Sequence, residues 1–123
     1  MNERLWPEPV PLRAYGDGAF RFGEVRHEGA IFIMPGGIFA WRPAVFADVA
    51  AEDFAPALGC GCDIAFLLFG MGETHHPTPH WLMERAVLAG LSVECMTTGA
   101  AVRTFNVCME EGRIPATFLL PVA

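Results

Sequence analysis

The sequence predicts a single α/β domain with three layers, in which an antiparallel β meander is followed by a β-α-β-α-β half with a mostly parallel central sheet. Three observations predict this class. The first half of the chain has short apolar runs separated by glycine-bearing turns. The second half has three apolar runs of strand length, separated by two segments that carry helix start and stop residues. The length of 123 residues fits one hydrophobic core.

Residues 1–14 are predicted to be an irregular N-terminal arm, and residues 15–123 to be the α/β domain. Three prolines in the arm exclude a helix there. From Tyr15 the pattern becomes that of a meander of short antiparallel strands. The expected strands cover 19–22, 25–27, 31–34 and 38–41. An alanine-rich segment then predicts a short helix within 48–57, which Pro56 and Gly59 would end.

The second half of the chain alternates strands and helices over short connections. Residues 63–70 form a continuous apolar run, as in a strand that is covered on both faces. Thr78 is typical of an N-cap, Pro79 of a first helical residue and Gly90 of a helix end, so we expect a helix over 79–89. The remaining elements are a strand over 91–96, a helix that Thr97 or Thr98 caps and that ends before Gly112, and a strand over 116–120. Such units join parallel strands through right-handed crossovers.

The composition excludes several classes of protein. With 53% hydrophobic and 18% charged residues, the chain is not expected to be disordered. The net charge of −6 argues against binding to nucleic acid, and we see neither a membrane span nor a signal peptide. A cytoplasmic protein is therefore expected. The mean hydropathy of +0.35 implies an unusually apolar core or an apolar surface that faces a partner.

Two loops predict a binding edge. In open parallel sheets, ligands bind outside the carboxyl ends of the strands. Gly70, Met71 and Gly72 follow the first predicted core strand, and Thr97 and Thr98 follow the second. Both loops should therefore meet at the same edge of the sheet. The Gly-x-Gly pattern alone is also what a tight turn requires, so it does not by itself indicate a ligand.

The helix after Thr98 begins in an unusual way. Its start lacks the Glu or Gln of a capping box, which leaves N–H groups free for an anion or a partner's carboxylate. Arg103 lies in the first turns, where the helix dipole disfavours a cation, and Asn106 follows it on a polar strip. Three interpretations remain: an Arg103 pair with Glu110 or Glu73 while Asn106 bonds a loop, a pocket for a small anion, or a partner-binding patch.

No metal, cofactor or catalytic site is predicted. His75, His76 and His80 fit no zinc spacing and are interpreted as exposed loop histidines. Cys60 and Cys62 are interpreted as part of a turn before a strand, with a redox-active or metal-binding pair as the alternative. We expect no disulfide framework, and the two other cysteines should be buried small hydrophobes. No nucleophile, base and acid stand at a recognisable spacing, so the sequence gives no positive sign of an enzyme.

The C-terminal run MTTGAAVRTFNVCMEEGRIPATFLLP resembles a family of small domains from bacteria, archaea and mitochondria, whose mitochondrial member is respiratory complex I assembly factor 3. The family pattern has a Thr, then Ala-Cys-x-Thr-Tyr-Asn, then Glu-x-Arg and an apolar strand. The matching positions here are Thr98, Ala101, Thr104, Asn106, Glu111 and Arg113. The resemblance extends from about Tyr15 to Pro121. Two positions depart from the pattern, with Val102 in place of Cys and Phe105 in place of Tyr.

The resemblance implies a mixed central sheet with helices on one face, and the meander with a helix on the other. It implies no established enzyme activity, and for the mitochondrial relative it implies a chaperone-like role in building complex I. The leading hypothesis is therefore a non-enzymatic binding or assembly protein with a protein partner. The alternative is an anion-binding protein or enzyme that uses the strand-end crevice near Arg103. A homodimer is a further expectation, because the meander offers exposed strand edges.

Overall fold

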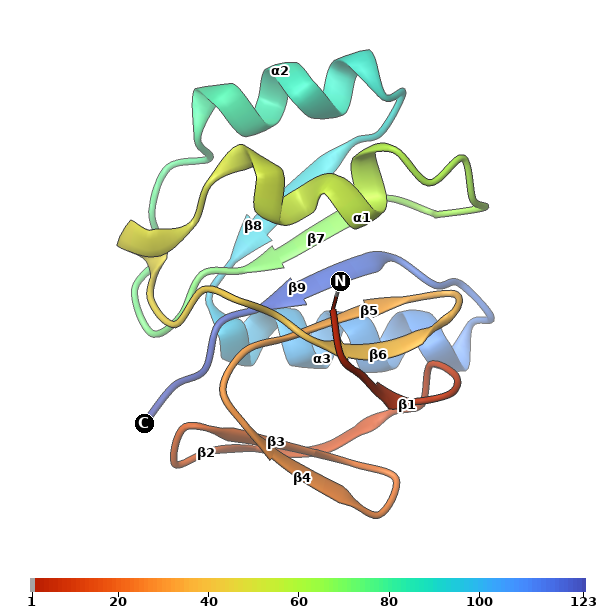
Figure 1. The fold of residues 1–123 in the computed structure, drawn as a ribbon, viewed down its shortest axis with the longest axis vertical. Coiled ribbons are helices and arrows are strands. Elements are labelled where there is room, and N and C mark those ends of the chain that lie inside the picture. Colours follow the sequence, from red (N-terminus) through yellow and green to blue (C-terminus); the bar gives the residue numbers. More distant parts are fainter. Residues whose placement is uncertain (1) are drawn as a thin grey trace.

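The computed structural model describes residues 2–123 (Figure 1). In chain order the strands are β1 (Arg4–Trp6), β2 (Leu12–Gly16), β3 (Ala19–Phe22), β4 (Val25–Glu28), β5 (Ile31–Met34), β6 (Gly37–Ala40), β7 (Leu67–Gly70), β8 (Val93–Met96) and β9 (Ala116–Leu119). The helices are α1 (Ala55–Leu58), α2 (His80–Leu88) and α3 (Thr98–Glu110), and two 3-10 turns, η1 (Phe46–Asp48) and η2 (Ala51–Phe54), precede α1.

Six strands form one mixed sheet in the order β1-β6-β5-β9-β7-β8. β7 pairs in parallel with both β8 and β9, so the predicted β-α-β-α-β half is confirmed. β9 also pairs antiparallel with β5, and this contact joins the two halves of the chain into one sheet. The predicted class of mixed α/β domain is therefore confirmed.

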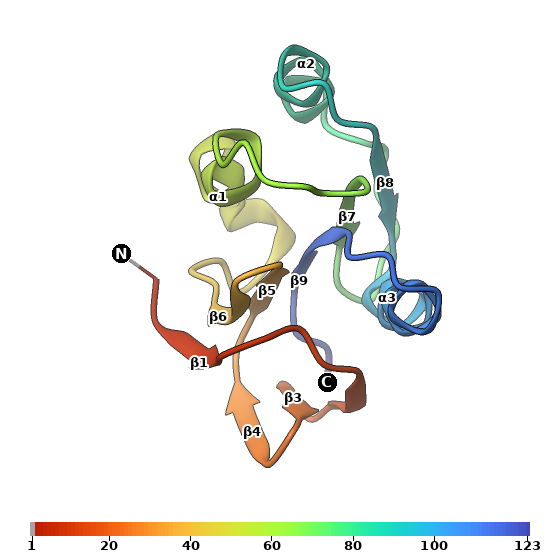
Figure 2. The ribbon, with the colours of Figure 1, turned by 90° about the vertical axis from the view of Figure 1, so that its right-hand side faces the viewer.

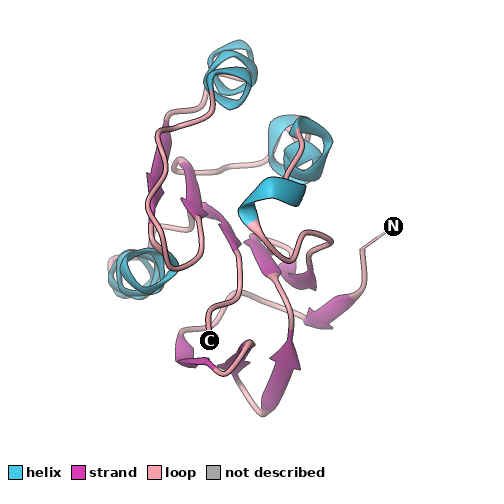
Figure 3. Ribbon diagram, turned by 90° about the vertical axis from the view of Figure 1, so that its left-hand side faces the viewer, coloured by secondary structure: helices cyan, strands magenta, loops and turns pink. Residues whose placement is uncertain are grey.

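This sheet is the middle one of three layers. On one face lie α3 and a second, three-stranded sheet of β2, β3 and β4, and on the other lie α1 and α2 (Figures 2 and 3). Side chains alternate along β5, so this strand contributes to the core on both faces of the sheet. Ile31 and Ile33 pack toward α3 and the small sheet. Phe32 and Met34 pack toward the face that carries α1 and α2. The arrangement that the family resemblance implied is the one observed.

The prediction for residues 1–14 was wrong in part. Residues 4–6 form β1, which adds an edge strand beside β6, and β2 already begins at Leu12. The prolines do exclude a helix, but an edge strand that stops before Pro7 is compatible with them. The close contact of β1 and β6 needs Gly37, because a Cβ there would lie 2.4 Å from the Trp6 carbonyl oxygen. The independence of residues 15–123 as a domain stays a prediction.

Other boundaries also differ from expectation. The meander is divided, since β2, β3 and β4 form their own sheet while β5 and β6 join the large one. The apolar run over 63–70 contributes a strand only from Leu67, and the run over 91–96 only from Val93. The helix predicted within 48–57 consists of two 3-10 turns and one α-helical turn. The predicted helix ends are confirmed, with Gly90 and Gly112 at φ of +74° and +77° just beyond α2 and α3.

α2 begins one residue later than predicted. Pro79 has a φ of −59° but a ψ of 132°, so it precedes the helix instead of opening it, and its carbonyl accepts hydrogen bonds from the N–H groups of Leu82 and Met83. Thr78, the predicted cap, instead lies within hydrogen-bonding reach of Cys95 on β8. Burial raises the pKa of the Cys95 thiol, and the contact with Thr78 partly offsets that rise.

An ion pair holds η2 against the loop after β6. The Arg42 guanidinium donates to both carboxylate oxygens of Asp53, at 2.9 and 2.6 Å, and the Ala50 N–H donates to the same carboxylate at 2.8 Å. The bond from Arg42 is the main reason that the pKa of Asp53 is lowered from its ordinary value, and the Ala50 N–H lowers it further, while partial burial works in the opposite direction.

This ion pair predicts a pH dependence of stability. Because the pKa of Asp53 is lower in the folded state than the ordinary 3.8, its stabilising contribution should be complete above that value and be lost as the pH falls through the folded-state pKa. The Asp53→Asn variant should therefore be less stable than the parent at pH 7, and the difference should shrink in acid below the ordinary value. Melting temperatures of the two proteins across pH 2–7 test this, and a difference that stays constant would contradict it.

Candidate functional site

The two predicted loops do meet at the carboxyl ends of β7 and β8. The Met71 N–H donates to the Met96 carbonyl at 2.8 Å, and the Thr98 N–H donates to the Gly72 carbonyl at 2.9 Å. The first strand-end loop, residues 70–72, is thus hydrogen-bonded to the start of α3. The topology explains this contact, because parallel neighbours end at the same edge of a sheet.

Thr98 is the centre of this edge. Its hydroxyl accepts a hydrogen bond from the Gly72 N–H at 2.9 Å and donates one to the Leu120 carbonyl at 2.7 Å. The side chain is completely buried. It therefore joins three chain segments, and its hydrogen-bonding capacity is used within the protein. Thr97 occupies the N-cap position of α3, but its side chain makes no capping bond, which corrects the prediction that one of the two threonines caps the helix.

The start of α3 is also covered from outside. The Tyr15 side chain lies against Gly99, where an added Cβ would be 2.6 Å from the tyrosine oxygen. Gly70 has a similar role beneath the helix, because a Cβ there would lie 2.7 Å from a methyl group of Leu119 and 3.1 Å from the Ala101 side chain. The small residues at these positions therefore allow α3 to lie close to β7 and β9.

Asn106 binds backbone rather than a ligand in this structure. Its side-chain oxygen accepts from the Leu12 N–H at 2.8 Å, and its side-chain nitrogen donates to the Leu12 carbonyl at 2.9 Å. These two bonds attach the beginning of β2 to α3. We expected Asn106 to bond a loop, but its partner Leu12 is the first residue of strand β2.

Arg103 lies apart from the strand-end edge. It is exposed on α3, and among residues 2–123 neither Glu110 nor Glu73, nor any other group, accepts a hydrogen bond or forms an ion pair with it. The predicted pairing of Arg103 was therefore wrong.

The other positions of the family motif have structural surroundings. Ala101 is fully buried against β7, and the Thr104 hydroxyl lies 3.4 Å from the Met96 sulfur. Glu111 and Arg113 form an exposed ion pair at 3.8 Å, and the Arg113 guanidinium lies 5.5 Å from the centre of the Phe66 ring. Their assignment as structural positions of the family motif stays a prediction.

A crevice of about 400 Å³ does open at the strand-end edge. It is bounded by residues 44–47, 71–74, His76 and 120–123, so it includes Met71 and Gly72 but neither Arg103 nor Asn106. The His76 ring stacks on the Phe46 ring, with 4.0 Å between their centres. The charged side chain at its wall is Glu73, which disfavours an anion there. The arrangement does not support the predicted anion pocket at this edge.

In the part of the chain that the structure describes, the cysteines and histidines form no common site. Cys60 and Cys62 are joined by a disulfide in the exposed loop before β7, which corrects our expectation of a simple turn without a disulfide. Cys108 is buried, as predicted, and Cys95 is partly buried. His80 lies 3.0 Å from Glu84 on α2. Within residues 2–123 no three side chains of the metal-binding types come together.

α2 carries an apolar surface that was not predicted from the sequence. The exposed fractions of the side chains are 45% for Met83, 71% for Val87 and 85% for Leu88. Leu82 and Ala86 already supply the buried face of the helix, so these three residues are not needed for the core. Their spacing was the available signal, because Met83 and Val87 are four residues apart and project on one side of the helix. We call Met83, Val87 and Leu88 the α2 patch.

The α2 patch continues into a groove. A hollow of about 410 Å³ lies between α2 and the segment formed by η2 and α1. It is lined mainly by small and apolar side chains, with Glu52 and Arg85 at its rim. Its lining residues are Ala51, Glu52, Ala55, Leu58, Gly59, Arg85, Leu88 and Ala89. Leu88 belongs to both the groove and the patch, so the two form one surface.

The sequence pattern of a family of proteins of unknown function, DUF498/DUF598, matches residues 12–120. This chain belongs to that family. The matched part contains every element of the fold from β2 to β9, and thus the strand-end edge, the α2 patch and the groove.

Several relatives of this DUF498/DUF598 protein have known sequences or structures. An uncharacterised protein of Rhodobacter capsulatus is 29% identical over 113 residues, which cover 92% of this chain and 86% of the relative. A protein of Bartonella henselae described as an outer membrane protein has a crystal structure that superposes with a TM-score of 0.88 at 36% identity, over 97% of this chain and 100% of that chain. A Bordetella pertussis protein described as a Mth938-like domain superposes with a TM-score of 0.74 at 30% identity, over 91% and 85% of the two chains.

The likeness to the Bordetella protein shows that this member of the DUF498/DUF598 family has the Mth938-like fold. No helix within residues 2–123 has the length and apolarity that crossing a membrane requires. Since one relative is described as an outer membrane protein, the cytoplasmic location stays a prediction.

Proposed function

We propose that this protein is a non-enzymatic binding protein that assists the assembly of a larger complex, and that it contacts its partner through the α2 patch. The observation that carries the proposal is the exposure of Met83, Val87 and Leu88 on one helix. A cluster of large apolar side chains in water is unfavourable unless a partner covers it, and such clusters are typical of protein-binding surfaces. α2 is also the outermost helix of the fold (Figure 1).

The shape of this surface supports an apolar helix as the partner's contact element. Alanines and a glycine line much of the groove, and small side chains allow another helix to approach closely. Leu88 would then pack beside the inserted helix, while Glu52 and Arg85 at the rim would face its polar side.

The identity of the partner is a second part of the proposal. The resemblance to respiratory complex I assembly factor 3 supports a subunit of a respiratory complex, or a protein that helps to build one. The hydrogen bonds of Thr98 and Asn106 support the absence of catalysis at the motif positions, because both side chains are held by backbone groups. The strand-end residues Gly70, Met71, Gly72 and Thr97 then serve to position α3, and Arg103 on that helix lies outside the proposed contact.

Photocrosslinking in the host cell would test the α2 patch. A photoreactive phenylalanine analogue at Leu88 should give one discrete adduct, and peptide mapping should place it on an apolar helix of another protein. With that partner purified, Leu88→Lys should weaken binding by about thirtyfold, as expected for the loss of a central apolar anchor. The fold should tolerate the change, since lysine is a good helix former and a cation is favoured at a helix C-terminus.

Val107 on α3 is the matched control, because it is also an exposed aliphatic residue on a helix. The photoreactive analogue at Val107 should give no adduct with the same partner, and Arg103→Ala should leave its affinity within about twofold, as surface changes outside a contact do. Equal adducts at positions 88 and 107 would contradict the proposal. An adduct only with a second copy of this chain, together with a dimer in light scattering, would replace assembly by self-association.

A further inference from the structure

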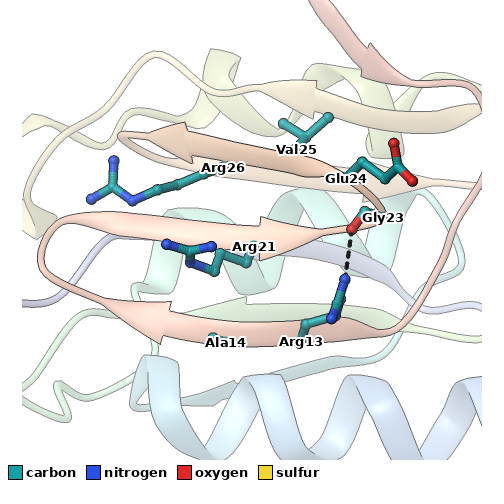
Figure 4. A pocket seen from close by; sticks show the side chains of 7 residues that line it. All are labelled: Arg13, Ala14, Arg21, Gly23, Glu24, Val25 and Arg26. Atoms are coloured by element: carbon teal, nitrogen blue, oxygen red, sulfur yellow. Dashed lines mark hydrogen bonds between the residues drawn. The ribbon is translucent and has the colours of Figure 1, made fainter.

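The outer face of the small sheet carries three of the eight arginines of this acidic protein. Phe20 and Phe22 of β3 are buried beneath the sheet, so alternation along the strand directs Arg21 to the outside. Arg26 on β4 and Arg13 on β2 are exposed beside it. The three side chains line one hollow of about 460 Å³ (Figure 4). We call Arg13, Arg21 and Arg26 the arginine cluster.

The register of the sheet forces two of these charges together. β3 and β4 pair so that Arg21 lies directly opposite Arg26. Like charges that face each other across antiparallel strands are destabilising. Arg26 has a partial partner, because Glu28 accepts from it at 3.1 Å, but that pair is exposed. Within residues 2–123, Arg21 has no hydrogen-bond acceptor and no ion-pair partner at all.

The hollow between the arginines has a defined shape. Ala14 lies opposite Arg21 on the other side, and its small side chain leaves space above the centre of the sheet. The register of β2 shifts between Leu12 and Ala14, and the intervening Arg13 reaches across to donate to the Gly23 carbonyl at 3.2 Å. This bond, drawn in Figure 4, fixes Arg13 at the rim of the hollow. Two carboxylates also face this surface, Glu24 at its wall and Asp17 at the end of the β2–β3 hairpin.

We propose that the arginine cluster binds the phosphoryl group of a small molecule. Guanidinium groups present planar pairs of donors that match the oxygens of a phosphate, and each bond is strengthened by charge on both partners. A doubly charged phosphoryl group would bridge Arg21 and Arg26 and remove the repulsion between them. Glu24 would lie beside the bound group and favour a ligand that carries a hydroxyl or amino group next to the phosphate. The hollow is large enough for a metabolite-sized molecule.

This site is independent of the proposed function. The small sheet lies at the opposite end of the molecule from α2 (Figure 1). A failure of the arginine cluster to bind would leave the α2 patch untouched, and the reverse also holds. The anion site proposed here lies on the small sheet, whereas the sequence suggested one in the crevice near Arg103.

An NMR titration of the isotope-labelled protein with sodium pyrophosphate would test the site. Chloride is used to keep the ionic strength constant, so that general screening is the same in every sample. Amide signals of β2, β3 and β4 should shift in a saturable manner. Arg21→Ala should weaken binding by about tenfold or more, as expected when a charge-assisted hydrogen bond is removed. Arg103→Ala, which removes an equally exposed arginine from α3, should leave the affinity unchanged.

Three results would overturn the assignment. Linear, non-saturating shifts would show that pyrophosphate only screens the surface. An equal loss of affinity in the Arg21→Ala and Arg103→Ala variants would show that net charge decides binding. Citrate or a glutamate-rich peptide that binds more tightly than pyrophosphate would show that the cluster selects carboxylates or an acidic protein segment instead. If Arg21→Ala does not fold, Arg21→Gln in the same titration gives the same comparison.

Discussion

Replacing Thr98 by valine is expected to lower the free energy of unfolding by at least about 2 kcal/mol, because each of the two buried polar groups that lose their partner costs about 1–3 kcal/mol. Valine keeps nearly the same volume and fills the same space. It removes the hydroxyl, however, so both the Gly72 N–H and the Leu120 carbonyl lose their hydrogen bonds in a fully buried position. Urea unfolding followed by tryptophan fluorescence would measure the loss.

Two matched variants identify the hydroxyl as the cause. Thr98→Ser keeps the hydroxyl and removes one methyl group, so it should cost only about 1 kcal/mol. Thr104→Val, on the same helix, removes a hydroxyl that is only partly buried and contacts a sulfur atom, so its effect should be smaller still. A Thr98→Val protein as stable as the parent would show that water replaces the lost partners and that the edge is more open than the structure indicates.

The consequence for function is direct. If the two hydrogen bonds of the Thr98 hydroxyl stabilise the fold this strongly, the presence of Thr98 in the family motif needs no ligand as an explanation. The same holds for Asn106, whose two bonds to Leu12 span 94 positions of the sequence. A binding assay on variants of these two residues would then mainly report unfolding. The exposed α2 patch and the arginine cluster are the surfaces where a substitution can change binding without changing the fold.

The sequence was sufficient for the second half of the fold because the signals there are local. An apolar run, a proline or threonine before a helix, and a glycine after it lie within a few residues of one another, and the parallel order then follows from short right-handed crossovers. The meeting of the two strand-end loops follows from the same topology. The hydrogen-bond partner of each polar residue at that edge could not be predicted, because only the tertiary structure brings the partner near.

The first half was harder for a physical reason. β1 has three residues and too few positions to show an alternating pattern, and its partner β6 lies more than 30 residues away. The division of the meander into two sheets depends on β5 pairing with β9 near the end of the chain. Nothing local to residues 31–34 specifies that partner.

One missed feature has a local signal in the sequence. A two-residue turn at Gly23 and Glu24 pairs the residues on either side of it and therefore places Arg21 opposite Arg26. Two arginines that face each other on the exposed side of a hairpin are unfavourable, and the spacing of the hairpin residues is enough to predict this conflict. The α2 patch was harder to predict, because the sequence pattern of the helix does not show which of its apolar residues are buried in the core.

The largest single effect on stability is expected at Phe118. This residue of β9 is fully buried, and its ring lies 5.2 Å from the rings of Phe32 and Trp41 and 4.9 Å from that of Phe54, measured between centres. Phe118→Ala removes the ring around which strands, η2 and the loop after β6 pack. A change of this kind costs about 3–5 kcal/mol, and a small domain has only about 5–15 kcal/mol in total. The variant should be partly unfolded at 37 °C, as circular dichroism would show.

The Phe46→Ala variant shows whether the cost of Phe118→Ala comes from the loss of tight packing or from the loss of any aromatic ring. Phe46 belongs to the edge of the same cluster, is only partly buried, and stacks on His76 at the wall of the strand-end crevice. Phe46→Ala leaves a space that water can enter, so it should cost clearly less than Phe118→Ala. If both variants lose the same free energy, the cluster is loosely packed throughout. If only Phe118→Ala is severe, the aromatic layer under η2 and α1 is the rigid support on which the groove and the α2 patch are held.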